Sequence, residues 1–304
     1  MIDVIIPAYN AFDTIGDTLE SLSIQKNRDN LKVYIINDGS TASYDNIIKQ
    51  YNNMLDITEI ITENHGPGQA RQTGIDNSNN EYICFIDADD IIADDESLLE
   101  LYNTIQNNDL AQGHFKKISK NKEEIMPPQQ GYLHGKLYRR SIIKKNNIFF
   151  DVKMRCDGDI YEDSTFSQLY SLYCKKKAKT DKVVYHYRYS QNSITNKKYC
   201  KDNNLHNFID ANTWFFNEVD RRHIQNDYEL SWNVYAICFY IYFYYLSNPS
   251  KNDFVFEEAS IIKKNYCKYK DYLPYTVQCT LYNRLSKENI IPTITFYDFM
   301  DKIK

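Results

Sequence analysis

The sequence predicts an α/β fold, with a mostly parallel sheet covered by helices and a mainly helical C-terminal extension. Over the first 90 residues, short β-branched runs alternate with stretches of helical length, which is the order of a parallel sheet with helical crossovers. The apolar runs are continuous rather than alternating, as in strands that are buried on both faces. Beyond residue 200, Tyr- and Phe-rich segments with helical spacing dominate the chain.

The first region contains four predicted strands separated by three predicted helices. The strands are 3–7, 31–36, 57–61 and 81–86, and the helices are 12–25, 42–53 and 68–77. In sheets of this kind, ligands bind beyond the carboxyl ends of the strands. The residues that follow each strand are therefore the first candidates for a functional site.

The rest of the chain is predicted to be mixed up to residue 200 and helical after it. Strand-like segments occur near 110–119 and 181–189, helical ones near 140–146 and 162–175, and breaks at Asn248-Pro249, Pro274 and Pro292. We predict a domain over 1–200 and a helical region over 201–304 for acceptor binding, membrane association or oligomerisation. The apolar run 234–246 has 13 residues, too few to span a bilayer, and is predicted to be a core helix.

The composition is that of an ordinary globular protein, but its charge is unevenly distributed. The chain has 304 residues, of which 42% are hydrophobic and 25% are charged. Residues 1–110 hold five basic and 20 acidic residues, against 31 basic and 21 acidic residues in the remainder. Two solvated surfaces that attract each other are one interpretation. The other is a basic half that binds an anionic acceptor, such as a lipid phosphate, a membrane face or a nucleic acid.

Cysteine usage and the first residues bear on the compartment. The seven cysteines are scattered and form no C-x-x-C pair, which favours a reduced environment over a disulfide framework or a zinc site. The opening MIDVIIPAYN has neither a basic segment nor a long apolar one, so we expect no signal peptide. The predicted location is the cytoplasm, and a peripheral contact with the inner membrane face is left open.

Polar and acidic residues follow three of the predicted strands, as PAYN at 7–10, NDGS at 37–40 and DADD at 87–90. Asp87 and Asp89 are two positions apart, so they point to the same side of an extended chain. Two hard oxygen donors suit Mg²⁺ or Mn²⁺, which also bind waters and substrate phosphates. An EF-hand is excluded, because its sixth position would be Ile92 where glycine is required. A solvated cluster that caps the next helix is the alternative.

Two further motifs begin predicted helices. HGPGQARQTG at 65–74 opens with small residues and has Arg71 one turn into the helix, an arrangement that suits anion binding. It is neither a G-x-G-x-x-G fingerprint nor a Walker A loop, and Arg71 in a structural ion pair is the alternative. Glu162 and Asp163 begin another helix, where acids complement the helix dipole. The functional alternative is a general base that accepts a proton from an acceptor hydroxyl.

Together these motifs resemble those of the family 2 glycosyltransferases, inverting nucleotide-sugar enzymes with the Rossmann-like GT-A fold. The resemblance covers residues 1–195. The matching segments, in chain order, are VIIPAYN near the start, INDGS at 36–40, GPGQARQTGI at 66–75, FIDADD at 85–90, HGKLYRRS at 134–141, YED at 161–163 and YHYRYSQNSIT at 185–195.

The resemblance implies a role for each matching residue. Asp163 would be the catalytic base, with Glu162 beside it. Asp89 would coordinate Mn²⁺ or Mg²⁺ bridging the donor diphosphate, with Asp87 by the ribose and the metal. Many relatives have a metal- or diphosphate-binding His shortly before a Ser-Ile pair. Here His186 is taken as the third metal ligand and Arg188 as a phosphate contact. The alternative is that either side chain contacts phosphate instead of the metal. The other implied nucleotide contacts are Pro7, Ala8, Tyr9, Asn10, Asp38, Gly68, Arg71, Ala88 and Lys136.

The expected function is a cytoplasmic, metal-dependent transfer of a sugar, most simply from a UDP-sugar, to an acceptor hydroxyl. The acceptor would be a growing surface glycan or a lipid-linked saccharide. One alternative is a glycosyltransferase that modifies hydroxymethylated bases in DNA, whose acceptor binding would weaken steeply with salt. Another is a non-catalytic nucleotide-sugar-binding scaffold.

Overall fold

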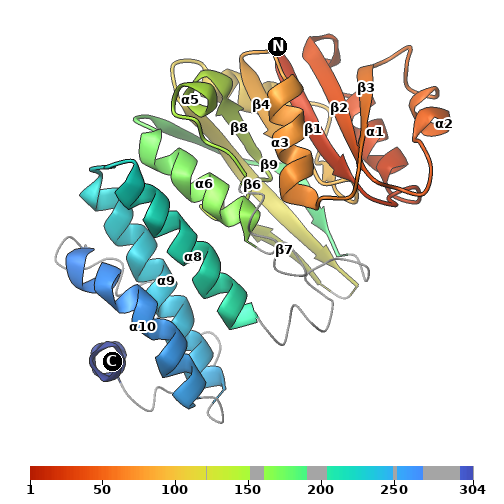
Figure 1. Ribbon diagram of the computed structural model, residues 1–304. Coiled ribbons are helices and arrows are strands. Elements are labelled where there is room, and N and C mark those ends of the chain that lie inside the picture. Colours follow the sequence, from red (N-terminus) through yellow and green to blue (C-terminus); the bar gives the residue numbers. More distant parts are fainter. Residues whose placement is uncertain (121, 151–160, 190–203, 249–251, 270–294, 304) are drawn as a thin grey trace. The chain divides into compact units, whose positions relative to one another are not determined.

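The computed structural model describes residues 1–120, 122–150, 161–189, 204–248, 252–269 and 295–303 (Figure 1). The chain divides into two compact units, Met1–Lys198 and Tyr199–Lys304, where a division after residue 200 was predicted. The roles predicted for the second unit stay predictions.

The first unit is built on a nine-stranded sheet with the order β3-β2-β1-β4-β8-β6-β9-β5, in which β7 pairs with β6. Strands β1 to β4 are the parallel part that the sequence predicts. Beyond β4 the sheet is mixed, since β8 runs antiparallel to β4 and β6, whereas β9 is parallel to β6. Strands β6, β7 and β8 follow one another without a helical crossover, and such connections join antiparallel strands. The strands are β1 (Ile2–Ala8), β2 (Leu31–Asp38), β3 (Asp56–Thr62), β4 (Tyr82–Phe85), β5 (Ile91–Ile92), β6 (Leu110–Ser119), β7 (Lys122–Met126), β8 (Lys136–Arg139) and β9 (Lys177–Arg188).

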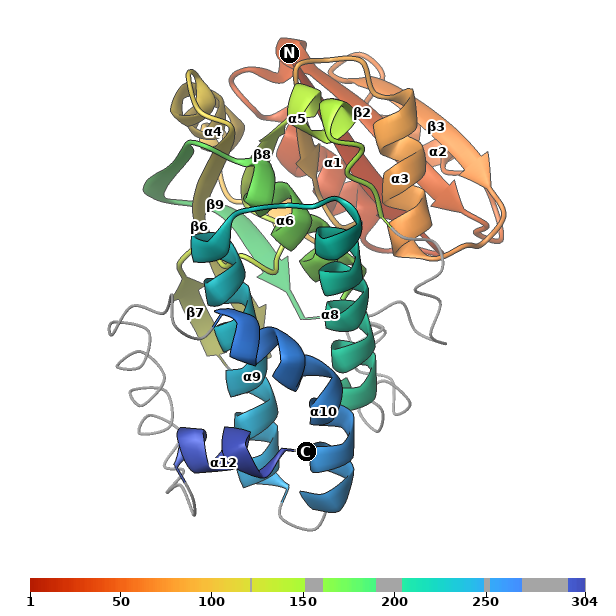
Figure 2. The same cartoon turned by 60° about the vertical axis from the view of Figure 1, so that its left-hand side comes forward.

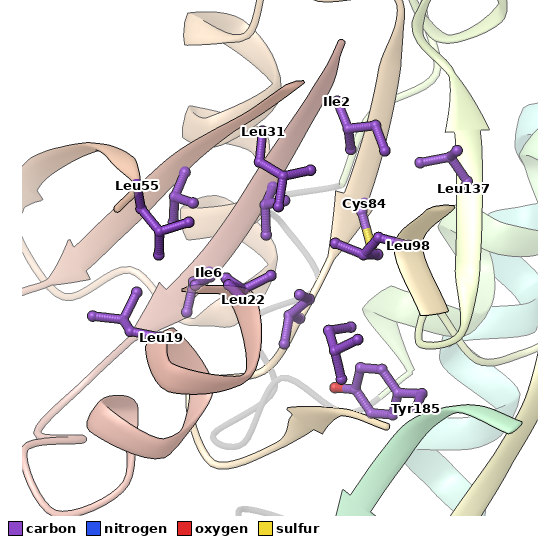
Figure 3. Packing of buried hydrophobic residues seen from close by; sticks show 14 of the residues in the cluster. Ile2, Ile6, Leu19, Leu22, Leu31, Leu55, Cys84, Leu98, Leu137 and Tyr185 are labelled. Atoms are coloured by element: carbon purple, nitrogen blue, oxygen red, sulfur yellow. The ribbon is translucent and has the colours of Figure 1, made fainter. Parts of the chain in front are cut away.

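Helices cover both faces of this sheet (Figures 1 and 2). Strand β1 contributes buried side chains to both faces of the sheet, because side chains alternate in direction along a strand. Ile6 packs in one apolar cluster with Leu19 of α1 (Figure 3). Ile5 points the other way and meets Gly74 of α3. The helices of this unit are α1 (Ile15–Ser23), the 3₁₀ turn η1 (Arg28–Asn30), α2 (Asp45–Ile48), α3 (Pro67–Asn77), α4 (Ser97–Ile105), α5 (Arg140–Lys145) and α6 (Glu162–Tyr173).

Two elements differ from their predictions. The helix predicted over 42–53 is only the single turn α2, and turns follow it as far as residue 54. Asn52 and Asn53 lie in these turns, and asparagine favours turns over helix interiors. Strand β3 is mostly half-buried or exposed, because it is the last strand at one edge of the sheet.

The described part of the second unit is helical, as predicted. Its helices are α8 (Asn204–Arg221), α9 (Asp227–Ser247), α10 (Asn252–Tyr269) and α12 (Phe296–Lys302). The apolar run 234–246 lies in α9 and is largely buried, with the ring of Tyr242 5.2 Å from that of Phe299. No helix in the described ranges is long and apolar enough to cross a membrane. Helix α9 ends just before Asn248, and the breaks predicted at Pro274 and Pro292 lie outside the described residues.

Candidate active site

The loops that follow β1 and β2 are joined at the carboxyl edge of the sheet. The chain leaves β1 through Pro7 and Ala8 and turns at Tyr9 and Asn10. Asn10 adopts a left-handed backbone with φ of 51°, which asparagine tolerates well. Its amide donates to the hydroxyl of Ser40 at 2.9 Å. Of the four residues predicted here as nucleotide contacts, Tyr9 and Asn10 are exposed, Tyr9 at 56%.

Asp38 ends β2 and ties that strand to the start of α3. One carboxylate oxygen accepts from the amide of His65 and the other from the amide of Gly66, both at 2.8 Å. Gly66 caps α3 with φ of 87°, a conformation that favours glycine, and Pro67 then begins the helix. The side chain of Asp38 therefore joins the end of β2 to the start of α3. Its nucleotide contact stays a prediction.

The three carboxylates after β4 have different surroundings. Asp90 is fully buried and accepts from the Tyr185 hydroxyl and the Arg188 amide, both at 2.7 Å. It therefore anchors the loop to β9. The Tyr185 hydroxyl also accepts from the amide of Asp87 at 3.2 Å. Asp87 and Asp89 are only half-buried, so their carboxylates are the candidates for contact with a ligand.

Asp87 and Asp89 fit the oxygen donor set of a divalent cation. Burial and, after it, the neighbouring charge of Asp87 together raise the pKa of Asp89 to about 6. A cation between the two carboxylates would offset both effects. Within the described ranges, no three His, Cys, Asp or Glu side chains are grouped to hold a metal ion. The two aspartates would therefore share the ion with water and donor phosphates, as Mg²⁺ sites commonly do.

Arg71 connects this loop to α6. Its Nη2 donates to Asp87 at 2.7 Å, and its Nη1 donates to Glu162 at 2.6 Å. The side chain is buried, at 8% exposure. Burial alone would lower the pKa of Arg71, but the carboxylates of Asp87 and Glu162 outweigh it and raise the pKa. Arg71 thus forms the ion pairs that its alternative interpretation predicts, and a nucleotide contact stays a prediction.

Asp163, the predicted base, lies in the first turn of α6 beside Glu162. One of its oxygens accepts from the amide of Ser164 at 2.7 Å. Burial raises the pKa of Asp163 to about 7, and the charge of Glu162 contributes to the increase. Burial also raises the pKa of Glu162, whereas Arg71 opposes that change. A carboxylate with a pKa near neutrality is suited to general base catalysis.

Arg188 braces the acidic loop from the end of β9. Its Nε donates to the main-chain oxygen of Asp89 and its Nη1 to the carboxylate of Asp17, both at 2.6 Å. Its Nη2 is buried and has no hydrogen-bond partner among the described residues. Ala88, in the same loop, accepts from the Thr18 hydroxyl at 3.2 Å. The predicted phosphate contact of Arg188 would use Nη2, and it stays a prediction.

Two predicted site residues are placed elsewhere. His186 pairs with Ile91 in the ladder between β9 and β5, and it alternates with Tyr185, whose hydroxyl faces Asp90. It therefore points to the other face of the sheet, where Lys116 lies, and its role as a metal ligand stays a prediction. Lys136 is 1% exposed and donates to the oxygens of Gln130 and Ser167, each at 3.1 Å. It therefore has a structural role under α6, and its nucleotide contact stays a prediction.

Gly68 has a packing role in the structure, and its nucleotide contact stays a prediction. A Cβ atom there would lie 3.0 Å from the Cγ of Glu162. Tyr185 and His134 also belong to this region, although neither was predicted individually from the sequence. Their rings stack with centroids 5.0 Å apart. Burial lowers the pKa of His134 to about 3, so this ring is neutral. The alternation of aromatic residues in YHYRY at 185–189 is the signal that could have placed Tyr185 on the site face.

Comparison with known proteins identifies the family and the fold. Residues 3–224 match the family model described as Glycosyl transferase family 2. The chain belongs to this family. The resemblance drawn from the sequence motifs is therefore confirmed.

Two curated bacterial relatives illustrate the match. The putative glycosyltransferase EpsH of Bacillus subtilis is 29% identical over 219 residues, which cover 64% of this chain and 63% of EpsH. A poly(ribitol-phosphate) beta-glucosyltransferase of Bacillus spizizenii is 30% identical over 208 residues, which cover 62% of this chain and 32% of that protein. The matched region thus spans less than two thirds of the length of either relative.

Solved structures show the same fold. S. aureus TarS 1-349 in complex with UDP superposes with a TM-score of 0.69 at 18% identity, covering 94% of this chain and 87% of the TarS 1-349 chain. The mannosyltransferase PcManGT from Pyrobaculum calidifontis, in complex with GDP-Man and Mn²⁺, gives a TM-score of 0.54 at 15% identity, with coverage of 72% and 64%. The predicted GT-A fold is confirmed.

Proposed function

We propose that the chain is an inverting, metal-dependent glycosyltransferase that moves a sugar from a nucleotide-diphosphate sugar to an acceptor hydroxyl. One observation carries the proposal. Asp87, at the carboxyl edge of the sheet, and Glu162, beside the candidate base Asp163, are held together by the guanidinium group of Arg71. Groups suited to the donor and a group suited to the acceptor therefore meet at one place.

The proposed reaction is a single displacement. Asp163 accepts the proton of the acceptor hydroxyl, whose oxygen attacks the anomeric carbon on the face opposite the leaving diphosphate. The bond between that carbon and the diphosphate oxygen breaks, and the configuration inverts. Asp87 and Asp89 would hold Mn²⁺ or Mg²⁺, which when bound supplies Lewis acidity to the leaving diphosphate. Holding both substrates in line supplies much of the acceleration.

UDP is the proposed nucleotide, and an acceptor in surface glycan or lipid-linked saccharide synthesis is proposed with it. The similarly folded TarS structure contains UDP, and the mannosyltransferase structure contains Mn²⁺. One relative is named for poly(ribitol-phosphate), an anionic polymer. Such an acceptor is compatible with the excess of basic residues after position 110. The proposed location is the cytoplasm.

The test is a screen of nucleotide sugars for donor hydrolysis and transfer, with Mn²⁺, with Mg²⁺ and with EDTA. Asp163→Asn should abolish transfer and preserve nucleotide binding, whereas Asp89→Ala should remove the dependence on metal together with most turnover. Asp29→Asn is the matched control, because the side chain of Asp29 is 95% exposed. If the wild type binds nucleotide but neither hydrolyses nor transfers any donor, the chain is a binding scaffold and the proposal is wrong. If both site variants turn over like an active wild type, the roles proposed for Asp89 and Asp163 are wrong.

A further inference from the structure

Glu162 is held in place by an ion pair that reaches across three elements. The guanidinium of Arg71, in α3, contacts Glu162 at the first residue of α6 and Asp87 just after β4, at 2.6 and 2.7 Å. The Arg71 and Glu162 side chains are only 8% and 9% exposed. Because Arg presents its donors in a planar fork, it fixes the directions of both carboxylates as well as their distance.

Packing around the pair keeps α6 in the same position. The guanidinium of Arg71 lies 5.9 Å from the ring centroid of Phe150. The ring of Phe150 stacks on that of Phe166, one turn further along α6, with centroids 4.2 Å apart and planes 2° from parallel. On the other side, the first turn of α3 approaches so closely that a Cβ at Gly68 would meet Glu162 at 3.0 Å. The ion pair with Arg71 and the close approach of α3 therefore constrain the first turn of α6, and the stacking of Phe150 on Phe166 constrains the next turn.

We propose that Arg71 and Glu162 are positioning residues, which hold the first turn of α6 and with it Asp163 in register with Asp87 of the donor site. The proposal rests on the proposed function. In it, Glu162 is not a second base, because Arg71 binds one oxygen of its carboxylate, and Asp163 alone accepts the proton. A base has to lie within hydrogen-bonding reach of the acceptor hydroxyl, so a displacement of α6 lowers turnover without weakening the donor site.

Three variants change this arrangement in separate ways. Glu162→Gln keeps an oxygen that accepts from Arg71 but removes the charge. Arg71→Lys keeps the charge but loses the fork. Gly68→Ala removes no functional group and displaces Glu162 by contact. The measurements are kcat, the KM for donor and acceptor, and the affinity for UDP with Mn²⁺ by titration calorimetry.

We expect kcat to fall about tenfold to a hundredfold in each variant, the size of effect that a misplaced reacting group produces. Affinity for UDP with Mn²⁺ should stay near the wild-type value in Glu162→Gln and Gly68→Ala. The combined Arg71→Lys, Glu162→Gln variant should lose less than the product of the single losses, because both substitutions break one contact. Glu81→Gln is the control, since it breaks an exposed pair with Arg139 next to the opposite end of β4.

Two outcomes would overturn the proposal. If Glu162→Gln is as inactive as Asp163→Asn while Gly68→Ala is fully active, Glu162 takes part in proton transfer directly. If all three variants turn over like the wild type, the pair positions nothing. Failure of the proposed function gives a different result, because either the wild type would then turn over no donor or Asp163→Asn and Asp89→Ala would retain turnover.

Discussion

Asp89→Asn should stabilise the metal-free protein even though it removes a ligand from the proposed metal site. Burial and the charge of Asp87 raise the pKa of Asp89 from 3.8 to about 6. The folded state therefore holds a proton on this carboxylate more tightly than the unfolded chain does. As the pH rises from about 4 to about 6, the protein loses stability, and the full cost is present at higher pH.

The two pKa values set the size of the effect. One pH unit corresponds to 1.36 kcal/mol, so ionised Asp89 costs about 3 kcal/mol above pH 7 and about 1 kcal/mol at pH 4.5. Asparagine carries no charge at any pH and escapes this cost. Its amide still has to be hydrogen-bonded in a half-buried site, so the expected gain in the free energy of unfolding is about 1–3 kcal/mol at pH 8.

The assay is urea unfolding in EDTA at pH 8 and pH 4.5, followed by hydrogen exchange of the amides in β1 and β4. Tryptophan fluorescence is unsuitable, because Trp214 and Trp232 both belong to the second unit. Added Mn²⁺ should stabilise the wild type at pH 8 and leave Asp89→Asn nearly unchanged. Asp29→Asn should change the free energy of unfolding by less than about 0.5 kcal/mol.

The reasoning would be refuted by a variant that is less stable than the wild type at pH 8. It would also be refuted by a gain at pH 4.5 equal to the gain at pH 8. Either result means that the carboxylate of Asp89 carries no electrostatic cost in the metal-free fold.

Three further predictions concern the base, the packing of α3 and the anchor of the acidic loop. Because Asp163 must be unprotonated to act and its pKa is about 7, kcat/KM should rise with pH through that value, and Glu162→Gln should shift the rise to lower pH; an unchanged midpoint would contradict this. Gly74→Ala should cost about 1–3 kcal/mol of stability, because its Cβ would lie 2.4 Å from Ile5. Gly16→Ala, with nothing within 4 Å, should instead stabilise α1 by about 0.5–1 kcal/mol in the same urea titration. Tyr185→Phe should cost about 1–3 kcal/mol by leaving Asp90 short of a donor, and equal melting temperatures would contradict it.

The parallel half of the sheet could be predicted from local pattern alone. Continuous apolar runs identify strands that are buried on both faces, and the acidic residues directly after 81–86 identify a site edge without knowledge of the tertiary structure. The same local signals place Glu162 and Asp163 at the start of a helix, where α6 begins.

The remaining assignments depend on contacts between distant segments. Asp87, Asp89 and Asp90 look alike in the sequence. The buried one, Asp90, is distinguished by its contacts with the Tyr185 hydroxyl and the Arg188 amide, 95 and 98 residues further along the chain. The direction of His186 depends on the register of β9 against β5 and β6. A lysine at the start of a strand is ordinarily expected to be exposed. Lys136 is instead buried under α6, where its ammonium group donates to the hydroxyl of Ser167.

Helix α6 has two tasks, one in the proposed site and one in the hydrophobic core. Its first turn carries the proposed base, and its length supplies Phe166, Leu169 and Tyr170 to the interior. Few substitutions along it would spare both tasks. Selection for a new acceptor would therefore act mainly on segments outside this helix, and laboratory libraries aimed at altered specificity should leave α6 unchanged.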